Sequence, residues 1–207
     1  MQTVKGELME ELVFEKPSLK RKKDAIEFIK EFLDYKSNIN GSGGLDKGYL
    51  NYKFWLNRVI KNSKEETVEK GKVPASTYFV VRNSDNKIVG MVNIRHRLND
   101  YLLQYSGHIG DCVRPTERRK GFATQMIYMS LVECKDLGIE KVLLVCDKTN
   151  IGSSKQIINN LGQLENEVKD EKGQTIQRYW IDVENTIRKG TVHQQNEKAD
   201  VNKVFIK

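Results

Sequence analysis

The segment VRPTERRKGFATQMI, residues 113–127, places three consecutive cations directly before a glycine and the start of a helical pattern. An extended run, GHIGDCV, ends at Val113, and the apolar period of a helix begins near Phe122. Between them Gly121 permits a tight turn, so that the free N–H groups of the first helical turn converge at the positive end of the helix. The segment therefore predicts a strand, loop and helix that together bind an anion such as a phosphate.

The residues around this glycine have expected parts in the anion site. Gly121 lets the main chain approach a ligand closely, Ala123 keeps the entrance free of bulk, and Thr124 offers a hydroxyl. Positive charge is supplied by Arg118, Arg119 and Lys120. A dinucleotide-binding loop would need the spacing G-x-G-x-x-G between parallel strands, and this segment lacks it.

The rest of the chain predicts a mixed α/β fold, α+β in type, around a largely antiparallel sheet. Runs of β-branched and aromatic residues predict strands, and apolar residues at helical spacing predict helices. In chain order the expected elements are a helix at 19–33, a helix from 50, strands at 77–83, 87–96 and 107–113, a helix at 122–137, a strand at 141–146, a short helix within 151–161, and a hairpin of 163–169 with 175–183. Asp85 and Asn86 suit the turn of the central hairpin.

The first two expected helices carry apolar faces and a glycine-rich connection. The first is expected to bury Ile26, Ile29 and Leu33 beside two phenylalanines and to expose its lysines. The second is expected to follow Leu50, Phe54, Leu56 and Ile60, with Trp55 in the core. Residues 41–48 between them predict a flexible loop, which lacks the Lys-Ser or Lys-Thr step of a nucleotide-binding P-loop. Residues 97–106 are expected to form another loop.

Composition limits the classes of protein that fit. The chain has 207 residues and 35 Lys and Arg against 28 Asp and Glu, a net charge of +7. Such a charge favours anionic partners only weakly, because it is often a solvated surface. No apolar stretch approaches the roughly 20 residues that span a bilayer and no signal-peptide pattern is present, so a cytoplasmic protein without membrane contact is expected. The three cysteines and three histidines show no metal-ligand spacing, and neither a disulfide nor a metal site is expected.

At the anion loop the chain resembles the GNAT superfamily of acyl-CoA-dependent N-acetyltransferases. The pyrophosphate loop of that family reads Gln or Arg, two residues, Gly, one residue, and Gly or Ala, and Arg118, Gly121 and Ala123 match it. The order of expected elements follows the family across roughly residues 10–183, and residues 94–123 are similar to a little-characterised bacterial branch. The resemblance implies a GNAT-type twisted sheet flanked by helices.

In this interpretation residues 1–183 form a single GNAT acetyltransferase domain, and residues 184–207 form a polar C-terminal tail. The tail contains few apolar residues before its last few positions, so it can dock on the domain, dock on a second copy, or remain unfolded. A homodimer is therefore a possible assembly.

The resemblance implies acetyl-CoA as the cosubstrate, held in a V-shaped gap between the strand ending at Val113 and the strand ending at Cys146. The Val113 N–H would donate to the oxyanion that develops on the thioester. The residues expected to bind acetyl-CoA are Cys112, Val113, Arg118, Arg119, Lys120, Gly121, Phe122, Ala123, Thr124, Asn150 and Ser153. Asn150 and Ser153 are explained equally well as helix-capping residues.

The catalytic acid and base are harder to assign. Many family members carry a tyrosine that protonates the leaving thiolate, but the corresponding position here is Ile158. His108 is the candidate catalytic residue, because some members place a base on the same strand, although a lone strand histidine is more often structural. Transfer assisted by water without a dedicated acid is the alternative. Tyr179 is expected to be a core residue.

The acceptor is expected to be a primary amine, on either a small molecule or a protein. Two other classes of function compete with an enzyme. A regulatory domain that binds acyl-CoA without catalysis is suggested by the missing tyrosine. A nucleic-acid-binding module is suggested by the basic charge and the G-x-x-G at residues 107–110, but that motif lies in a strand pattern and lacks a cation between its glycines, so no nucleic-acid partner is expected.

Overall fold

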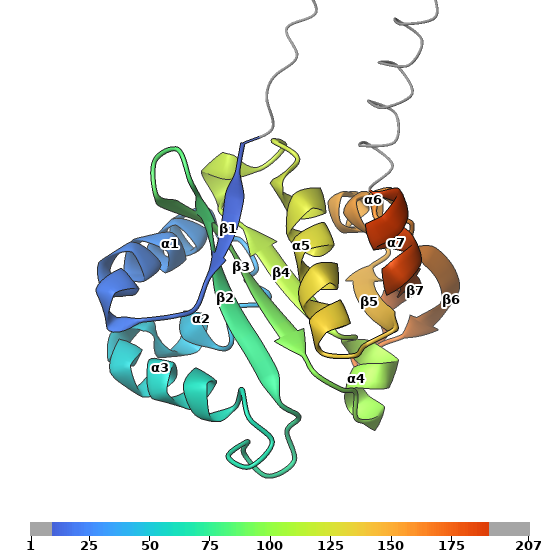
Figure 1. Ribbon diagram of the computed structural model, residues 1–207, viewed down its shortest axis with the longest axis horizontal. Helices are drawn as coiled ribbons and strands as arrows, with labels where there is room; N and C mark the ends of the chain where they lie inside the picture. The colour runs from blue at the N-terminus through green and yellow to red at the C-terminus, as the bar shows by residue number, and fades with distance from the viewer. Residues whose placement is uncertain (1–9, 191–207) are drawn as a thin grey trace, which may run out of the picture.

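The computed structural model describes residues 10–190 and contains two antiparallel sheets (Figure 1). The first has the strand order β1-β2-β3-β4 and the second β5-β7-β6. The first sheet is formed by β1 (Leu12–Glu15), β2 (Ala75–Arg82), β3 (Lys87–Arg95) and β4 (Ile109–Val113). The second is formed by β5 (Lys141–Asp147), β6 (Gln163–Lys169) and β7 (Thr175–Asp182). This mixed architecture confirms the predicted fold class.

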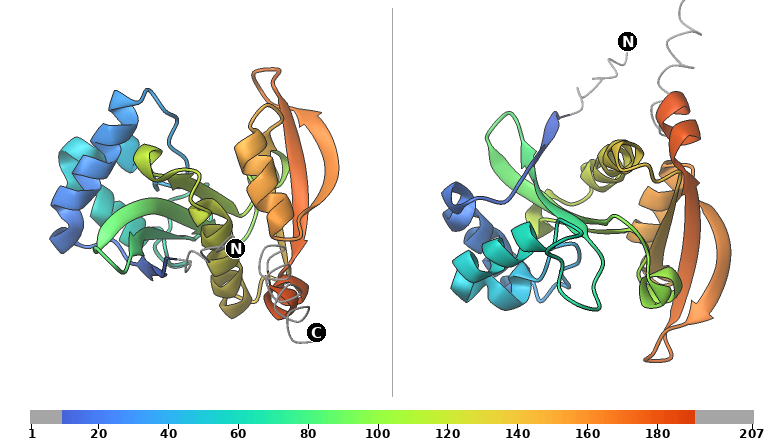
Figure 2. Two further views of the ribbon diagram at one scale, coloured as in Figure 1. Left: turned by 90° about the horizontal axis from the view of Figure 1, so that it is seen from above. Right: turned by 60° about the horizontal axis from the view of Figure 1, so that its bottom comes forward.

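The helices cover both faces of the first sheet and one side of the second (Figure 2). They are α1 (Lys22–Asp34), α2 (Leu45–Gly48), α3 (Tyr52–Lys61), α4 (Asp100–Tyr105), α5 (Phe122–Asp136), α6 (Ile151–Asn159) and α7 (Val183–Lys189). Three short 3₁₀ turns lie at Leu19–Arg21, Tyr49–Asn51 and Pro115–Glu117. Of the helices that the structure describes, none is long and apolar enough to cross a membrane.

Two hydrophobic cores lie on opposite faces of the first sheet. The core on the α5 side also reaches the second sheet and includes Val92, Ile94, Phe122, Met126, Leu131, Val142, Leu144 and Ile181. The core on the other side packs α1 and α3 against β2 and β3 and includes Phe28, Phe32, Tyr52, Trp55, Phe79 and Met91. Truncating a buried aromatic residue to alanine typically costs about 3–5 kcal/mol of stability, so both helix layers are firmly attached.

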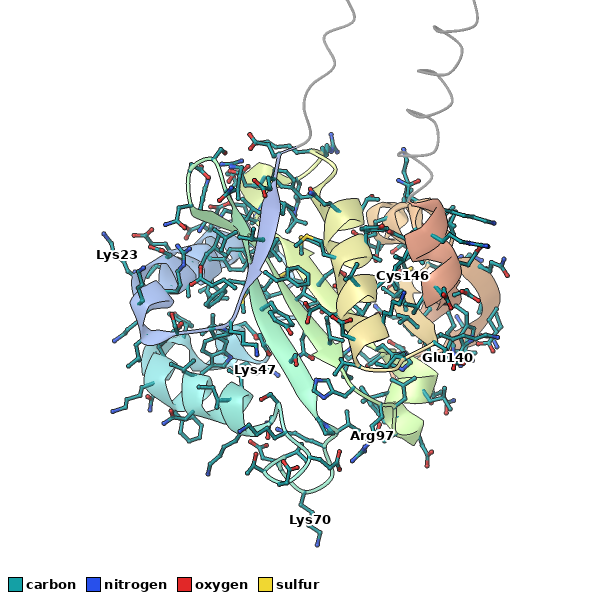
Figure 3. The ribbon with its side chains drawn as sticks, viewed as in Figure 1. Lys23, Lys47, Lys70, Arg97, Glu140 and Cys146 are labelled. Carbon is teal, nitrogen blue, oxygen red and sulfur yellow. The ribbon has the colours of Figure 1, made fainter. Side chains whose placement is uncertain are left out.

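The predicted apolar faces of the first two helices are only partly correct. Trp55 is fully buried, as expected, and its Nε1 donates to the carbonyls of Ser42 and Gly43. In contrast, Leu50 and Phe54 are 88% and 63% exposed, and Ile60 and Leu33 are also exposed. The buried face of α3 consists of Tyr52, Trp55, Leu56 and Val59. Lysines of the basic N-terminal cluster face solvent as predicted, and Figure 3 shows Lys23 pointing away from the molecule.

Three segments differ from the sequence-based expectation. Strand β1 was not predicted, and it pairs antiparallel with β2 at the edge of the sheet. The expected loop at 97–106 contains α4, whose first turn is capped by the Asn99 side chain accepting from the Leu102 N–H at 3.0 Å. The expected flexible loop at 41–48 contains α2 and packs tightly on β4, since a Cβ on Gly41 would lie 2.1 Å from the Gly110 carbonyl oxygen.

All of helix α7 after its first residue, Val183, lies inside the segment 184–207 that is expected to be a polar tail. It is capped by Asp182, whose carboxylate accepts from the Asn185 N–H at 2.8 Å, and it buries Thr186 completely. The Tyr128 hydroxyl on α5 donates to the Ile187 carbonyl at 3.3 Å. The chain therefore continues to pack on the domain after residue 183, while residues 191–207 of the expected tail lie outside the described residues.

Candidate active site

Strand β4 is the last strand of its sheet, and its free edge defines the site. The Arg95 N–H donates to the His108 carbonyl, and the Arg114 N–H donates to the Val89 carbonyl, both at 2.8 Å. Residues that bond to the neighbouring strand alternate with residues that do not in an antiparallel pair. With the observed register, the main-chain groups of Asp111 and Val113 therefore point away from β3. The N–H groups of both residues and the Asp111 carbonyl are available to a ligand, whereas the Val113 carbonyl accepts from Nε of Arg118 at 3.3 Å.

In the part of the chain that the structure describes, the two sheets meet directly before the beginning of β4. The His108 N–H donates to the Leu143 carbonyl at 2.7 Å, and the Leu143 N–H donates to Nδ1 of the His108 ring at 2.9 Å. A single bridge joins Gly107 to Leu144 next to this contact. Beyond it β4 and β5 belong to different sheets, which diverge on either side of α5 (Figure 2).

The turn from β4 into α5 exposes the start of a 15-residue helix. Gly121 has a φ of 79° and no side chain caps the helix, so the N–H groups of Phe122, Ala123 and Thr124 have no intrahelical acceptor. A Cβ on Gly121 would meet no atom within 4 Å, so the space above this turn is open. The uncapped N–H groups and the positive helix end fit a phosphate group.

Helix α1 holds the front of this loop in place. The Glu31 carboxylate accepts from the Thr116 N–H at 2.9 Å and from its hydroxyl at 2.8 Å. The Arg118 guanidinium donates to the Ser37 hydroxyl and lies over the Phe32 ring, 5.6 Å from its centroid. These contacts fix the loop before any ligand binds.

The three cations of the loop have different partners. The Lys120 ammonium donates to Glu117, a buried carboxylate that also binds Arg82 and Lys87. Burial alone would raise the pKa of Glu117, but the bonds from Lys120, Lys87 and Arg82 lower it to about 2, and the carboxylate stays ionised. Arg118 is held by α1, as described above. Within residues 10–190 the exposed Arg119 makes no hydrogen bond or ion pair, so its charge is available to an anion.

His108 is buried and its ring is already engaged. Since Nδ1 accepts the Leu143 N–H, the neutral ring carries its proton on Nε2, which leaves no free lone pair for a substrate proton. Burial, with a contribution from the nearby Arg95, lowers the pKa of His108 to about 4. The expected catalytic role of His108 stays a prediction, and the contacts give the ring a role in joining the two sheets.

Asp111 is the site residue that sequence reasoning missed. It lies on β4 and is half-buried, and Nε2 of Gln156 on α6 approaches its two carboxylate oxygens at 3.4 and 3.3 Å. Burial raises the pKa of Asp111 to about 6, which the hydrogen bond from Gln156 opposes. The available signal was a carboxylate inside a strand that ends at the anion loop.

The residues expected to contact the acyl-CoA arm on the other side are near α6. Asn150 caps this helix by accepting the Ser153 N–H at 3.1 Å, and a Ser153 hydrogen bond partly offsets the burial that raises the pKa of Cys146 to about 11. The Cys112 side chain packs into the α1 and α3 core, and its main-chain groups face β3. The main-chain groups that face outward on the free edge of β4 therefore belong to Asp111 and Val113. Ile158 is 51% exposed.

Other groups that could carry chemistry are accounted for by packing. Tyr179 is buried in the α5 core, as expected, and its hydroxyl donates to Gln177 at 2.8 Å. The three cysteines are buried and unpaired. Among the described residues no group of three His, Cys, Asp or Glu side chains could hold a metal ion.

Comparisons with solved structures show the same overall fold. A search of curated proteins finds no match. Similar solved structures include Mycobacterium smegmatis RimJ in complex with CoA-disulfide, which has a TM-score of 0.67 and 12% identity over 91% of this chain and 89% of that chain. Mutant forms of the spermidine/spermine N-acetyltransferase SpeG from Vibrio cholerae have a TM-score of 0.60 and 14% identity over 86% and 97%. The microcin C7 self immunity acetyltransferase MccE, in complex with acetyl-CoA and AMP, has a TM-score of 0.59 and 19% identity over 83% and 92%.

These structural likenesses show the fold, and the sequence itself shows the family. Residues 49–155, which include α3, the first sheet from β2 onward, the anion loop and the start of α6, match the sequence profile of the acetyltransferase (GNAT) family. The chain belongs to the GNAT family of acetyltransferases.

Proposed function

We propose that this protein transfers an acetyl group from acetyl-CoA to a primary amine by direct attack of the amine on the thioester. The observation that carries the proposal is the free edge of β4 leading into the uncapped start of α5. The edge can bind an extended chain of amide groups, as an added strand would, and the helix start can bind the pyrophosphate. Acetyl-CoA contains an extended chain of amide groups, a pyrophosphate and an activated acyl group.

The main chain of β4 orients the reacting atoms. The outward N–H and C=O groups of Asp111 bind the pantetheine arm, and the Val113 N–H is aimed at the thioester oxygen. A fixed N–H donor of this type typically contributes about a hundred- to thousand-fold in rate. Phe122, Ala123 and Thr124 hold the phosphates through their N–H groups, with Arg119 as the unpaired cation beside them.

Asp111 is the proposed general base, in place of His108. An amine of the lysine type has a reference pKa of about 10.4 and must lose a proton during attack. A carboxylate with a pKa of about 6 is ionised at neutral pH yet basic enough to accept that proton. His108 would first have to release the Leu143 N–H from its only basic nitrogen. The thiolate leaves without a dedicated acid, since Ile158 cannot donate, and water supplies its proton.

The deciding experiment incubates the protein with acetyl-CoA and a panel of primary amines and detects free thiol and acetylated products by mass spectrometry. Stoichiometric thiol and acetylamine are expected for at least one acceptor class. Acetyl-CoA binding without product for small amines and for peptide lysines would favour the regulatory domain instead. Neither binding nor product would remove the proposal. The cytoplasm, where acetyl-CoA and reduced cysteines coexist, is the proposed location.

A further inference from the structure

Arg95 is a partly buried cation without a carboxylate partner. Its Nη1 donates to the carbonyls of Ser106 and Gly107 at 3.2 and 3.1 Å, and within residues 10–190 it forms no ion pair. Arg82 and Arg114 in the same sheet region do pair with acidic residues. Burial lowers the pKa of Arg95 with no acidic group to offset it. A half-buried positive charge without an anionic partner raises the free energy of the folded protein, and a bound anion that pairs with it lowers that free energy.

The position of Arg95 connects it to the proposed reaction site. The side chain lies on the face of β3 opposite α5, which alternation along the strands shares with His108, Gly110 and Cys112. Its Nη2 lies 3.3 Å from the place where a Cβ on Gly110 would stand. The missing side chain at Gly110 therefore leaves room for the guanidinium beside β4, one residue before Asp111.

The surrounding elements frame a place for the acceptor on this face. The main chain of Gly41 lies above Gly110, with its N atom 3.2 Å from the same Cβ position. Helix α4 lies on the other side, since Arg95 binds the two carbonyls that follow it, and Figure 3 shows Arg97 near the end of β3 close to α4. The proposed thioester position lies at the free edge of β4, between this face and the face where Asp111 bonds Gln156 on α6, so an amine whose anionic group lies at Arg95 can reach both the thioester and the base.

We propose that the acceptor amine carries an anionic oxygen group, a carboxylate or a phosphonate-like group, that the Arg95 guanidinium binds. This inference rests on the proposed acetyl transfer. Gly110 and Val113 are three strand residues apart, about 10 Å. The hydrogen bond from Arg95 to the anionic group takes up part of this distance, and so does the gap between the attacking amine and the thioester carbon. The distance that remains fits a short alkyl chain between the anionic group and the amine. Amino acids with a terminal amine have this chemistry.

The test uses pairs of acceptors that differ only in the anionic group. Glycine, β-alanine and their longer homologues are compared with alkylamines of equal length, and an aminoalkylphosphonate series distinguishes carboxylate from phosphorus oxyanions. The readout is kcat/KM from thiol release by wild type, Arg95→Met, Arg95→Lys and Arg97→Met. Arg97 is the matched control, because it lies two residues further on and pairs with the exposed Glu65 at 2.5 Å.

Wild type is expected to favour the anionic member of the best pair by at least about tenfold, the usual value of a hydrogen bond to a charged group. Arg95→Met lowers kcat/KM for the anionic acceptors toward that of the matched alkylamines, Arg95→Lys keeps part of the preference, and Arg97→Met keeps all of it. If Arg95→Met fails to fold, wild type alone decides the question. Equal kcat/KM for both members of every pair overturns the inference, while product from neutral amines would leave the proposed function standing. No product from any amine overturns both.

Discussion

Asp111 lies on β4 and His108 lies directly before it, three positions earlier in the chain, and burial moves their pKa values in opposite directions. Loss of water disfavours the charged form of each group, so the pKa of Asp111 rises to about 6 and that of His108 falls to about 4. At neutral pH the carboxylate is ionised and the imidazole is neutral. The two residues therefore predict different pH dependences for the reaction.

The first prediction concerns the pH profile of kcat/KM. With Asp111 as base, activity falls as the pH drops through about 6, because the protonated carboxyl cannot accept the amine proton. Asp111→Asn should lower kcat about a hundredfold or more and abolish this limb, with acetyl-CoA affinity retained. His108→Ala should keep the limb, although its stability falls with the loss of the Leu143 contact. If the limb disappears in His108→Ala but remains in Asp111→Asn, His108 is the general base.

The same carboxylate predicts a change in stability. Its pKa is about 6 in the folded protein against an ordinary 3.8, so the folded state binds the proton more tightly. The stabilisation from this protonation is complete below about pH 4 and is lost as the pH rises through 6. Above pH 7 the buried charge opposes folding, and Asp111→Asn should raise Tm at pH 7.5 but not at pH 4. A lower Tm at pH 7.5 would show that the carboxylate stabilises the fold.

Gly121 predicts a separation of affinity from stability. Valine at a φ of 79° is strained by roughly 1–2 kcal/mol, and its side chain would stand where the pyrophosphate approaches. Gly138→Val is the matched control, because Gly138 ends the same helix with a φ of 73° and an equally open Cβ position. Titration calorimetry should show acetyl-CoA affinity at least about tenfold weaker in Gly121→Val and unchanged in Gly138→Val, with similar losses in Tm. Equal affinities in the two variants would remove the loop from the binding site.

At the residue scale the anion loop could be predicted from sequence, whereas the base could not. Gly121 and its flanking cations form a local pattern, since a helix start and a close approach of main chain depend on consecutive residues. The environment of Asp111 depends on Gln156, 45 positions further along the chain. No local pattern reports that contact, and a carboxylate in a strand is usually a solvated group.

At the element scale, α1 supports the anion loop across a long sequence separation. Glu31 accepts both the N–H and the hydroxyl of Thr116, which lies 85 residues later. Glu31→Ala should weaken acetyl-CoA binding several-fold, because the loop must then be ordered when the ligand binds. Glu27→Ala on the exposed face of the same helix is the control and should have little effect. Equal affinity in both variants would show that the loop keeps its shape without α1.

The element types were largely predictable, but the faces of the helices were not. Strands β2 to β7 and helices α5 and α6 follow clear periodic patterns in the sequence. In α3 and the 3₁₀ turn before it, apolar residues occur on all sides, and periodicity alone selected Leu50 and Phe54, which are exposed. Tyr52 and Trp55 decide the orientation because two large rings need the space against Phe79. The short strand β1 has only four residues and gains its structure from pairing with β2.

At the scale of the whole molecule, the proposed function depends on two sheets that are joined just before β4 and lie apart at its other end. The His108 and Leu143 contacts fix the joined end, and α5 fills the space beside the diverging strands (Figure 1). The free edge of β4, the uncapped start of α5 and Asp111 all lie along this divergence. We propose that acetyl-CoA binds there.

Amide hydrogen exchange measured residue by residue, with and without acetyl-CoA, tests that claim most directly. Acetyl-CoA should slow exchange at Asp111 and Val113 on the free edge of β4 and at residues 122–124 at the start of α5. The amides of Gly110 and Cys112 face β3 and should change little, which makes them internal controls. Binding without slower exchange at Asp111, Val113 and residues 122–124, or with protection confined to other elements, would contradict the account.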